Sequence, residues 1–449
     1  MWIPICQLLL IAQAVSAASS SFIVQLQGDK SFDDYLQESI ADLLGLKSDS
    51  TKNKIEIGSF KAFVSDFEDD LLSKLKADPF VNDIFPNTDI TLFAPVPETV
   101  EDATPGSKNP VKRSVLSPNA QRDSTFAKRD GVTTQSNAPR HLARLSSREG
   151  IFNKDGPFEY KYRETGKGVT AYVLDTGIAI DQDDFEGRAS HGANFVNGES
   201  DGDNNGHGTN VAGIVGSKTY GVAKDVQLVD IKVLGSNGQG SLESILKGIE
   251  WANNDRKSKN LTAVANLSLG SPKYEALNQA VDAAYEDGLS VVVAVGNADK
   301  DTEGFSPATS KNAIAVGALD DQTDTIACFS NWGSRVDIFA SGAGVVSVSN
   351  NGNPNLNKWY GTSQASPIVA GLAATLLEKG VPKDQIKNEI IKMSTKDAIS
   401  KKTYDENSNY KTTVNKVVYN GIENTFDTIN ASSTLSQDQS LRKYIEENY

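Results

Sequence analysis

Residues 168–175, GVTAYVLD, form a continuous apolar run that ends in an aspartate. A run without polar alternation is typical of a β-strand that is buried on both faces of a sheet. Four similar runs follow: VQLVDIKVL (226–234), AVANLSL (263–269), LSVVVAVG (289–296) and AIAVGAL (313–319). Helical stretches such as SLESILKGIEWANND (241–255) and EALNQAVDAAYEDG (275–288) lie between them. This alternation predicts an α/β fold with a mostly parallel central sheet and helices on both faces.

Polar residues that could take part in catalysis follow two of these runs or begin apolar helices. In a parallel sheet, the loops at the carboxyl ends of the strands carry the chemistry. Asp175 and Asn297 each follow a buried run directly, which places both at that edge. His207 in DNNGHGTNVAG and Ser363 in YGTSQASP each begin an apolar helix. A serine at a helix start has the positive end of the helix dipole and free backbone N–H groups beside it.

Three of these residues also have a purely structural interpretation. Asp175 suits a turn, His207 suits a packed helix start, and Ser363 suits the polar entry to a buried helix. Only three histidines, His141, His191 and His207, are available as an imidazole base. Serine is a poor nucleophile without such a base, so the enzymatic interpretation requires the four residues to come together.

The charge and the first residues limit the class of protein. A net charge of -14 argues against non-specific nucleic-acid binding, and no apolar stretch after the N-terminus is long enough to span a membrane. Residues 1–17 are typical of a signal peptide, with a buried helix as the alternative. Its removal would leave Cys328, which we expect to be packed, as the one cysteine. Secretion would expose three glycosylation sequons, which begin at Asn260, Asn266 and Asn430.

The remaining chain divides into further units. Residues 18–96 have the order β-α-β-β-α-β of a small ferredoxin-like domain, with the first helix over SFDDYLQESIADLLGL (31–46). Residues 97–137 lack periodicity and contain the dibasic pairs Lys112-Arg113 and Lys128-Arg129. These pairs fit either a plain solvated linker or a processing segment. Residues 138–421 hold the α/β domain, and residues 422–449 form a polar tail.

The order Asp175…His207…Ser363, with Asn297 before the serine, is the order of subtilisin. The motifs DTG, NGHGTNVAG, NLSLG, AVGN and YGTSQASP resemble the signatures of the subtilisin-like serine proteases, in particular the proteinase K and cerevisin-like branch of yeasts and fungi. The resemblance covers residues 138–421, and the N-terminal unit resembles the inhibitor propeptide of that family. It implies a serine endopeptidase that is made as a zymogen.

The resemblance also implies roles for individual residues. Asp175 would orient His207, His207 would be the general base and then the general acid, and Ser363 would form the acyl-enzyme. The Asn297 amide and the Ser363 N–H would hold the oxyanion. An extended substrate would pair with the remaining matched positions. These substrate-binding positions are Gly238, Ser268, Leu269, Gly270, Ala294, Val295 and Gly296.

Several positions depart from the family pattern. Asn210 stands where a second histidine is usual, Ile368 replaces another, and Val295 replaces an alanine. Gln364 replaces a methionine beside the nucleophile, which predicts a more polar rim of the site and resistance to oxidation. None of these changes removes an atom that the reaction needs.

No cofactor is required by this chemistry, although relatives bind a structural calcium ion. The matching positions are Asp337 and the carbonyls of Lys311 and Ala313, with a turn role for Asp337 as the alternative.

Two functions from different classes follow. The first is a secretory-pathway endopeptidase that acts on proteins and peptides, with its own propeptide as intramolecular inhibitor and chaperone. The second is an inactive protease-fold protein that serves as a binding, cell-wall or spore-wall component. We expect a monomer that is secreted or held in the cell or spore wall, with the vacuole as the alternative location.

Overall fold

The computed structural model describes residues 21–28, 32, 54–66, 69–93, 124–151, 156–351 and 358–422. The predicted signal peptide, the pair Lys112-Arg113, the sequon at Asn430 and most of the tail lie outside these residues. None of the described helices has the length and apolar character that crossing a bilayer requires.

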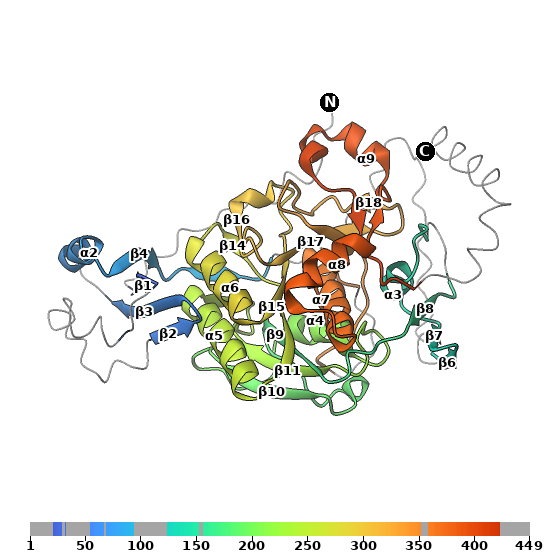
Figure 1. Cartoon of the computed structure of the whole chain (residues 1–449), viewed down its shortest axis with the longest axis horizontal. Coiled ribbons are helices and arrows are strands. Elements are labelled where there is room, and N and C mark those ends of the chain that lie inside the picture. The colour runs from blue at the N-terminus through green and yellow to red at the C-terminus, as the bar shows by residue number, and fades with distance from the viewer. Residues whose placement is uncertain are drawn as a thin grey trace.

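A large twisted sheet forms the centre of the molecule (Figure 1). Its strands are parallel from the first to the eighth in spatial order, and the ninth is antiparallel to its neighbour. The order is β10 (Ala189–Asn194), β11 (Gln227–Lys232), β9 (Val169–Asp175), β13 (Thr262–Leu267), β15 (Ser290–Ala294), β17 (Ile314–Asp320), β19 (Ile338–Ser341), β21 (Lys416–Val417) and β20 (Thr395–Lys396), with β18 (Thr325–Ile326) beside β17. The five apolar runs all form strands of this sheet, so the predicted fold class is confirmed.

Helices cover both faces of the sheet (Figure 1). Along β9, Ala171 and Val173 join the core that contains α4 (His207–Gly216) and α7 (Thr362–Glu378). Tyr172 and Leu174 join the core on the opposite face, with α5 (Leu242–Ser258) and α6 (Glu275–Asp287). Because successive side chains of a strand point to opposite faces, one fully apolar strand supplies both cores.

Shorter elements complete the peptidase domain. These are α3 (Arg140–Leu145), α8 (Ile386–Met393), α9 (Lys401–Glu406), the pair β14 (Ser271–Pro272) and β16 (Phe305–Ser306), and the 3-10 helices η4 (Asp183–Phe185), η5 (Thr302–Gly304), η6 (Lys383–Gln385) and η7 (Ser408–Thr412).

Cys328, which we expected to be packed, is exposed.

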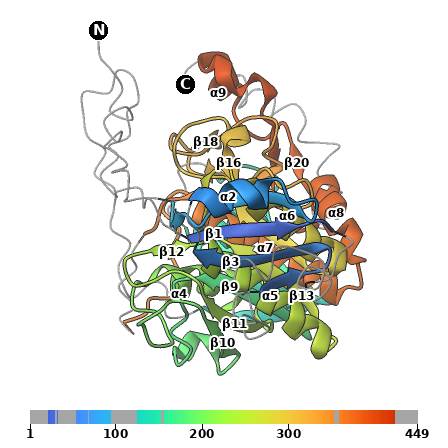
Figure 2. The same cartoon turned by 90° about the vertical axis from the view of Figure 1, so that its left-hand side faces the viewer.

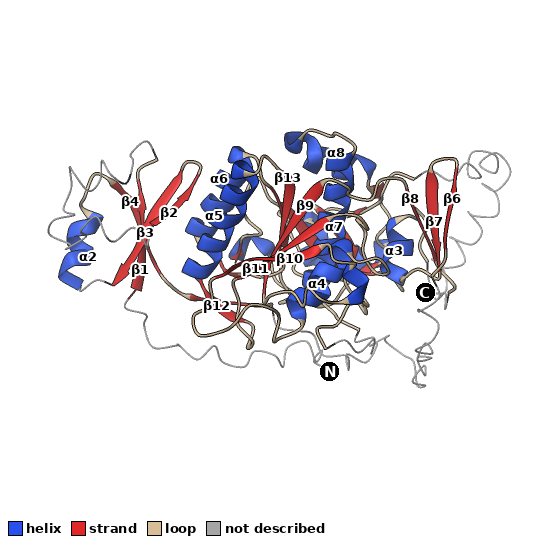
Figure 3. Ribbon diagram, turned by 90° about the horizontal axis from the view of Figure 1, so that it is seen from below, coloured by secondary structure: helices blue, strands red, loops and turns tan. Residues whose placement is uncertain are grey.

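The N-terminal unit is an antiparallel sheet that rests on the peptidase domain (Figures 2 and 3). Its order β2 (Lys54–Ile57), β3 (Phe60–Asp66), β1 (Ser21–Leu26) and β4 (Val81–Pro86) is that of the predicted ferredoxin-like domain, with α2 (Asp69–Lys76) on its outer side. The other predicted helix lies outside the described residues except Phe32. Ile55 and Ile57 share the core that contains Leu277 of α6, so the sheet buries its inner face on α5 and α6.

After β4 the chain leaves this sheet and crosses to the peptidase domain. β5 (Asp89–Thr91) pairs antiparallel with β12 (Gln239–Ser241), which precedes α5. Leu242 N donates to Thr88 O at 2.9 Å, which extends this contact toward the start of α5. The segment after the sheet is therefore held in a defined position on the larger domain.

One segment that we placed in the linker has a regular structure. β6 (Phe126–Arg129) and β7 (Val132–Ser136) form a hairpin that pairs with β8 (Glu159–Tyr162). Asp130 and Gly131 make its turn with φ angles of 53° and 76°, and Asp-Gly is a favoured sequence for a two-residue hairpin turn. The last residues of the segment that we placed in the linker thus pair with the peptidase domain, and the pair Lys128-Arg129 lies exposed at the end of β6.

Candidate active site

Asp175 and His207 meet at the carboxyl edge of the sheet. Asp175 is the last residue of β9 and His207 is the first of α4. His207 Nδ1 lies 2.7 Å from Asp175 Oδ1, and both side chains are buried. Since an ionised carboxylate only accepts, Nδ1 carries the proton and Nε2 is left as the basic nitrogen. The Thr176 backbone N–H donates to the same Asp175 oxygen at 2.8 Å, which fixes the carboxylate plane.

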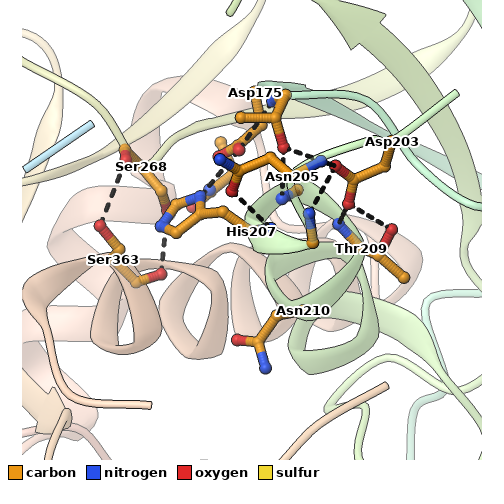
Figure 4. A network of polar contacts seen from close by, with 12 residues as sticks. Asp175, Asp203, Asn205, His207, Thr209, Asn210, Ser268 and Ser363 are labelled. Carbon is orange, nitrogen blue, oxygen red and sulfur yellow. Dashed lines mark hydrogen bonds and ion pairs between the residues drawn. The ribbon is translucent and has the colours of Figure 1, made fainter. Parts of the chain in front are cut away.

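Asp203 organises the loop that precedes His207 (Figure 4). Its Oδ1 accepts from Thr176 Oγ1 at 2.9 Å, from Asn205 N at 3.0 Å and from Gly206 N at 2.8 Å. Its Oδ2 accepts from both the N–H and the hydroxyl of Thr209, at 2.9 and 2.6 Å. A carboxylate here satisfies the orphan N–H groups of the first turn of α4. We did not predict a role for Asp203 from the sequence, although an aspartate just before a helix start is a capping signal.

Glycine is required next to the histidine. A Cβ added at Gly208 would lie 2.1 Å from Gly177 O and 3.2 Å from Asp175 Oδ1. The start of α4 therefore approaches the turn after β9 more closely than any side chain permits.

Ser363 lies at the second position of α7, with Pro367 four residues later in the same helix. Because proline has no N–H, the Ser363 carbonyl lacks its intrahelical donor. Ser268 Oγ donates to that carbonyl instead, at 3.0 Å, and the Ser363 hydroxyl donates to Ser268 O at 3.2 Å. Figure 4 shows the His207 ring between the Asp175 carboxylate and Ser363.

The other two histidines lie in separate surroundings. His141 Nε2 is 2.9 Å from Tyr220 O, and burial lowers the pKa of His141 to about 4. His191 Nδ1 pairs with Asp230 Oδ2 at 3.0 Å on the β10–β11 pair. His207 is therefore the histidine that the fold brings to Asp175 and Ser363.

Asn297 is held at the start of α7. Its Oδ1 accepts from the N–H and from the hydroxyl of Thr362, both at 2.8 Å. Two donors on one side identify that atom as the oxygen, so Nδ2 faces away from Thr362. A Cβ added at Gly361 would lie 3.1 Å from this Nδ2, which places the amide donor beside the backbone just before Ser363.

The segment 89–93 of the N-terminal unit lies along the predicted substrate-binding positions. Leu92 N donates to Gly238 O at 2.9 Å, and Gly270 N donates to Thr91 O at 3.5 Å. With the β5–β12 pairing, the segment is held between two edges of the peptidase domain, as an added strand.

Phe93 ends this segment against two glycines. A Cβ added at Gly270 would lie 2.1 Å from Phe93 Cζ, and one added at Gly296 would lie 3.1 Å from its Cε1. The space that the ring occupies exists because neither residue has a side chain. Of the predicted substrate-binding positions, Gly238, Gly270 and Gly296 contact the segment.

The other four predicted positions are fully buried: Ser268, Leu269, Ala294 and Val295. The Ser268 side chain is directed at α7, where Ser366 Oγ lies 2.9 Å from Ser268 Oγ, while Asn266 Nδ2 donates to the same oxygen at 2.9 Å. This position therefore supports the first turns of α7 with its side chain. It also shows that Asn266, the first residue of a sequon, is used inside the fold.

Gln364 is placed differently from our expectation. We expected it at the rim of the site, but it is 1% exposed. Its Nε2 donates to Asn210 Oδ1 of α4 at 3.3 Å. The residue after Ser363 turns into the helix interface, so it changes the polarity of the interior and not that of the rim.

Two of the three predicted calcium ligands, Asp337 and the Ala313 carbonyl, have Lys387 as a partner. Lys387 Nζ lies 2.8 Å from both Asp337 Oδ2 and Ala313 O. The Lys311 side chain is exposed, with Nζ 3.6 Å from Glu286 Oε1. The described residues contain no cluster of three or more His, Cys, Asp or Glu side chains that could hold a metal ion.

Comparison with known proteins identifies the family. Residues 166–426 match the model of the Subtilase family of peptidases. The subtilase-type proteinase RRT12 of Saccharomyces cerevisiae is 36% identical over 93% of this chain and 85% of its own length. The chain belongs to the subtilase family.

Other comparisons agree with this assignment. Proteinase T of Parengyodontium album is 40% identical over 66% of this subtilase and 98% of its own length. The crystal structure of a cold-adapted subtilisin-like serine proteinase superposes with a TM-score of 0.57 at 35% identity, over 64% of this chain and all of that one. The chain is therefore a serine-type endopeptidase that acts on proteins, and the predicted enzyme class is confirmed.

Proposed function

We propose that this subtilase cleaves peptide bonds through Ser363, His207 and Asp175. As Ser363 Oγ attacks the substrate carbonyl, His207 takes its proton, and the imidazolium that forms is stabilised by Asp175. His207 then gives the proton to the leaving amine as the C–N bond breaks. Water, activated by the same imidazole, hydrolyses the acyl-enzyme. The observation that carries this proposal is the 2.7 Å contact between His207 and Asp175 beside the start of α7.

The oxyanion would be stabilised by two donors of the same helix entry. Asn297 supplies Nδ2, which the two bonds from Thr362 direct away from that residue. Ser363 supplies its backbone N–H in the first turn of α7, where no carbonyl four residues earlier belongs to the helix. Fixed donors of this kind need no reorganisation as charge develops.

The N-terminal unit acts, in our proposal, as an intramolecular inhibitor. Its segment 89–93 uses the backbone groups that an extended substrate would use, at Gly238 and Gly270. The sheet that carries the segment buries apolar residues on α5 and α6, so the segment is presented at high effective concentration. With this unit in place the chain would be an inactive zymogen, and removal of the unit would free these backbone groups for a substrate.

Phe93 indicates the preference of the site. A ring that fills the space between Gly270 and Gly296 matches a large apolar residue on the amino side of the cut bond. We propose that the enzyme prefers such residues, and that the bond after Phe93 is the one cleaved during maturation.

The location follows from the first residues. A signal peptide at residues 1–17 would send the protein into the secretory pathway, to the exterior, the cell or spore wall, or the vacuole. Asn260 is exposed and is available for glycosylation there, whereas Asn266 is buried.

A binding or wall protein without activity is the less favoured alternative, because a degenerate site would lack one of the residues that are assembled here. Hydrolysis of a peptide with a phenylalanine before the cut bond separates the two functions. Mature protein should cleave it, Ser363→Ala should not, and Ser366→Ala, a change at another buried serine of α7, should retain most of the activity. Absence of cleavage by correctly folded mature protein would favour the binding function.

A further inference from the structure

Lys387 joins three elements at the edge of the sheet that lies opposite the active site. Ala313 directly precedes β17, Asp337 directly precedes β19, and Lys387 is the second residue of α8. The Lys387 ammonium lies 2.8 Å from Asp337 Oδ2 and 2.8 Å from Ala313 O. The Ala315 N–H donates to the same carboxylate oxygen at 2.9 Å.

These contacts are partly shielded from water. The side chains of Lys387 and Asp337 are 27% and 19% exposed, and Ala313 is fully buried. A charge-assisted bond of normal length in such a place is stronger than a surface ion pair. Arg335, two residues before Asp337, carries a second positive charge, and Glu303 first and then Asp337 raise the pKa of its guanidinium.

Asp337 and the Ala313 carbonyl are two of the three ligands that the family resemblance assigns to calcium, the third being the Lys311 carbonyl. Calcium requires six to eight oxygen ligands at about 2.3–2.6 Å. An ion bound to Asp337 Oδ2 and Ala313 O would occupy the space of the Lys387 ammonium. It would also bring a double positive charge beside the Lys387 ammonium, and the two cations would share the Asp337 carboxylate. The residues present at this place do not fit a calcium ion.

We propose that the Lys387 ammonium replaces the structural cation, so that β17, β19 and α8 are linked by the charge of the chain itself. The Lys387 ammonium has Asp337 Oδ2 and Ala313 O as partners, the same two oxygens that the ion would have, and it neutralises the Asp337 carboxylate. The link then forms with folding and does not depend on the calcium concentration.

The experiment compares melting temperatures of the full chain in excess calcium chloride and in excess EDTA. Ser363→Ala is the background, because it prevents self-digestion. Asp337→Asn and Lys387→Met should each lower the melting temperature by about 2–4 °C, equally in both solutions. Lys392→Met removes a lysine of the same helix that is 77% exposed and lies beside Glu389. This control should leave the melting temperature unchanged.

Binding of calcium at Asp337 would give a different pattern of melting temperatures. If calcium binds at Asp337, Asp337→Asn will lower the melting temperature in calcium, and the difference will vanish in EDTA. A second measurement does not depend on stability. Elemental mass spectrometry after dialysis against calcium should find the same calcium content in Ser363→Ala with and without Asp337→Asn. A lower content with Asp337→Asn would overturn the proposal.

Discussion

Gln364 of α7 donates its side-chain amide to Asn210 of α4 at 3.3 Å, inside the interface between the two helices. Gln364 follows Ser363 directly, and Asn210 lies three residues after His207. Both are positions at which the chain departs from the family pattern. They are therefore a polar pair that joins the helix of the serine to the helix of the histidine.

The first prediction concerns the energy of this pair. Asn210→Ala and Gln364→Ala should each lower the free energy of unfolding by about 1–3 kcal/mol, because each leaves a buried amide without its partner. The double variant should lose less than the sum, by about 1 kcal/mol. Urea unfolding in the Ser363→Ala background measures the free energy of unfolding of the parent, the two single variants and the double variant. Strictly additive losses would show that the two amides are not coupled.

A second prediction concerns oxidation. The chain contains two methionines, of which Met1 lies in the predicted signal peptide and Met393 ends α8. Peroxide should therefore leave most of the activity of the mature enzyme intact, whereas Gln364→Met should lose activity as its thioether becomes a sulfoxide. Both proteins should carry Cys328→Ser, since Cys328 is exposed. Rapid inactivation of the protein that retains Gln364 would contradict this explanation.

The Asn297 amide gives a third prediction. Asn297→Ala should lower kcat by about 10²–10³-fold with a small change in KM, because the lost bond forms mainly in the transition state. Thr362→Val removes one of the two bonds that orient the amide and should have a smaller effect in the same direction. Steady-state kinetics on one peptide decide, and an unchanged kcat for Asn297→Ala would exclude it as an oxyanion donor.

A fourth prediction concerns maturation. Sequencing the N-terminus of the processed protein should find Ala94 as the first residue when Ser363 is present, and the precursor should persist in Ser363→Ala. Phe93→Asp should slow this cut, because a charge would enter the space against Gly270 and Gly296.

Processing by another protease would give different results. Cleavage after Arg113 or Arg129 in the Ser363→Ala protein, abolished by Arg113→Ala or Arg129→Ala, would assign maturation to a protease that recognises dibasic pairs.

The buried His141 gives a fifth prediction, on pH. Burial lowers its pKa from 6.5 to about 4 in the folded protein. Between these values the unfolded chain binds a proton that the folded protein does not, so the free energy of unfolding falls as the pH falls. His141→Gln keeps a donor toward Tyr220 O but does not titrate. Between pH 7 and pH 4.5, the protein with His141 should lose about 2–3 kcal/mol more than this variant. Equal losses would contradict the lowered pKa.

The sequence predicted the central sheet well because its strands are apolar on both faces. Runs such as 168–175 can be recognised without knowing their neighbours, and the residues that follow them lie at one edge by topology alone. The order Asp175, His207 and Ser363 then indicated which polar residues belong together. The geometry of the site was predictable to that extent.

Other features depend on contacts that a single sequence does not reveal. Successive residues of a helix point about 100° apart, so adjacency to Ser363 did not show that Gln364 faces the interior. Lys387 lies far along the chain from Asp337, and its approach to the carboxylate depends on where α8 packs. The hairpin at 126–136 is short and polar, and its Asp-Gly turn was the one signal that could have revealed it.

Mapping the adduct of a fluorophosphonate probe tests the central claim most directly, because the reagent bonds much faster to a serine that a neighbouring base activates than to an ordinary serine. Mature protein should carry one adduct, which peptide mass spectrometry locates on Ser363. His207→Ala, in a sample matured by another protease, should react far more slowly. An adduct on another residue, or no adduct on correctly folded mature protein, would contradict the assignment of Ser363, His207 and Asp175.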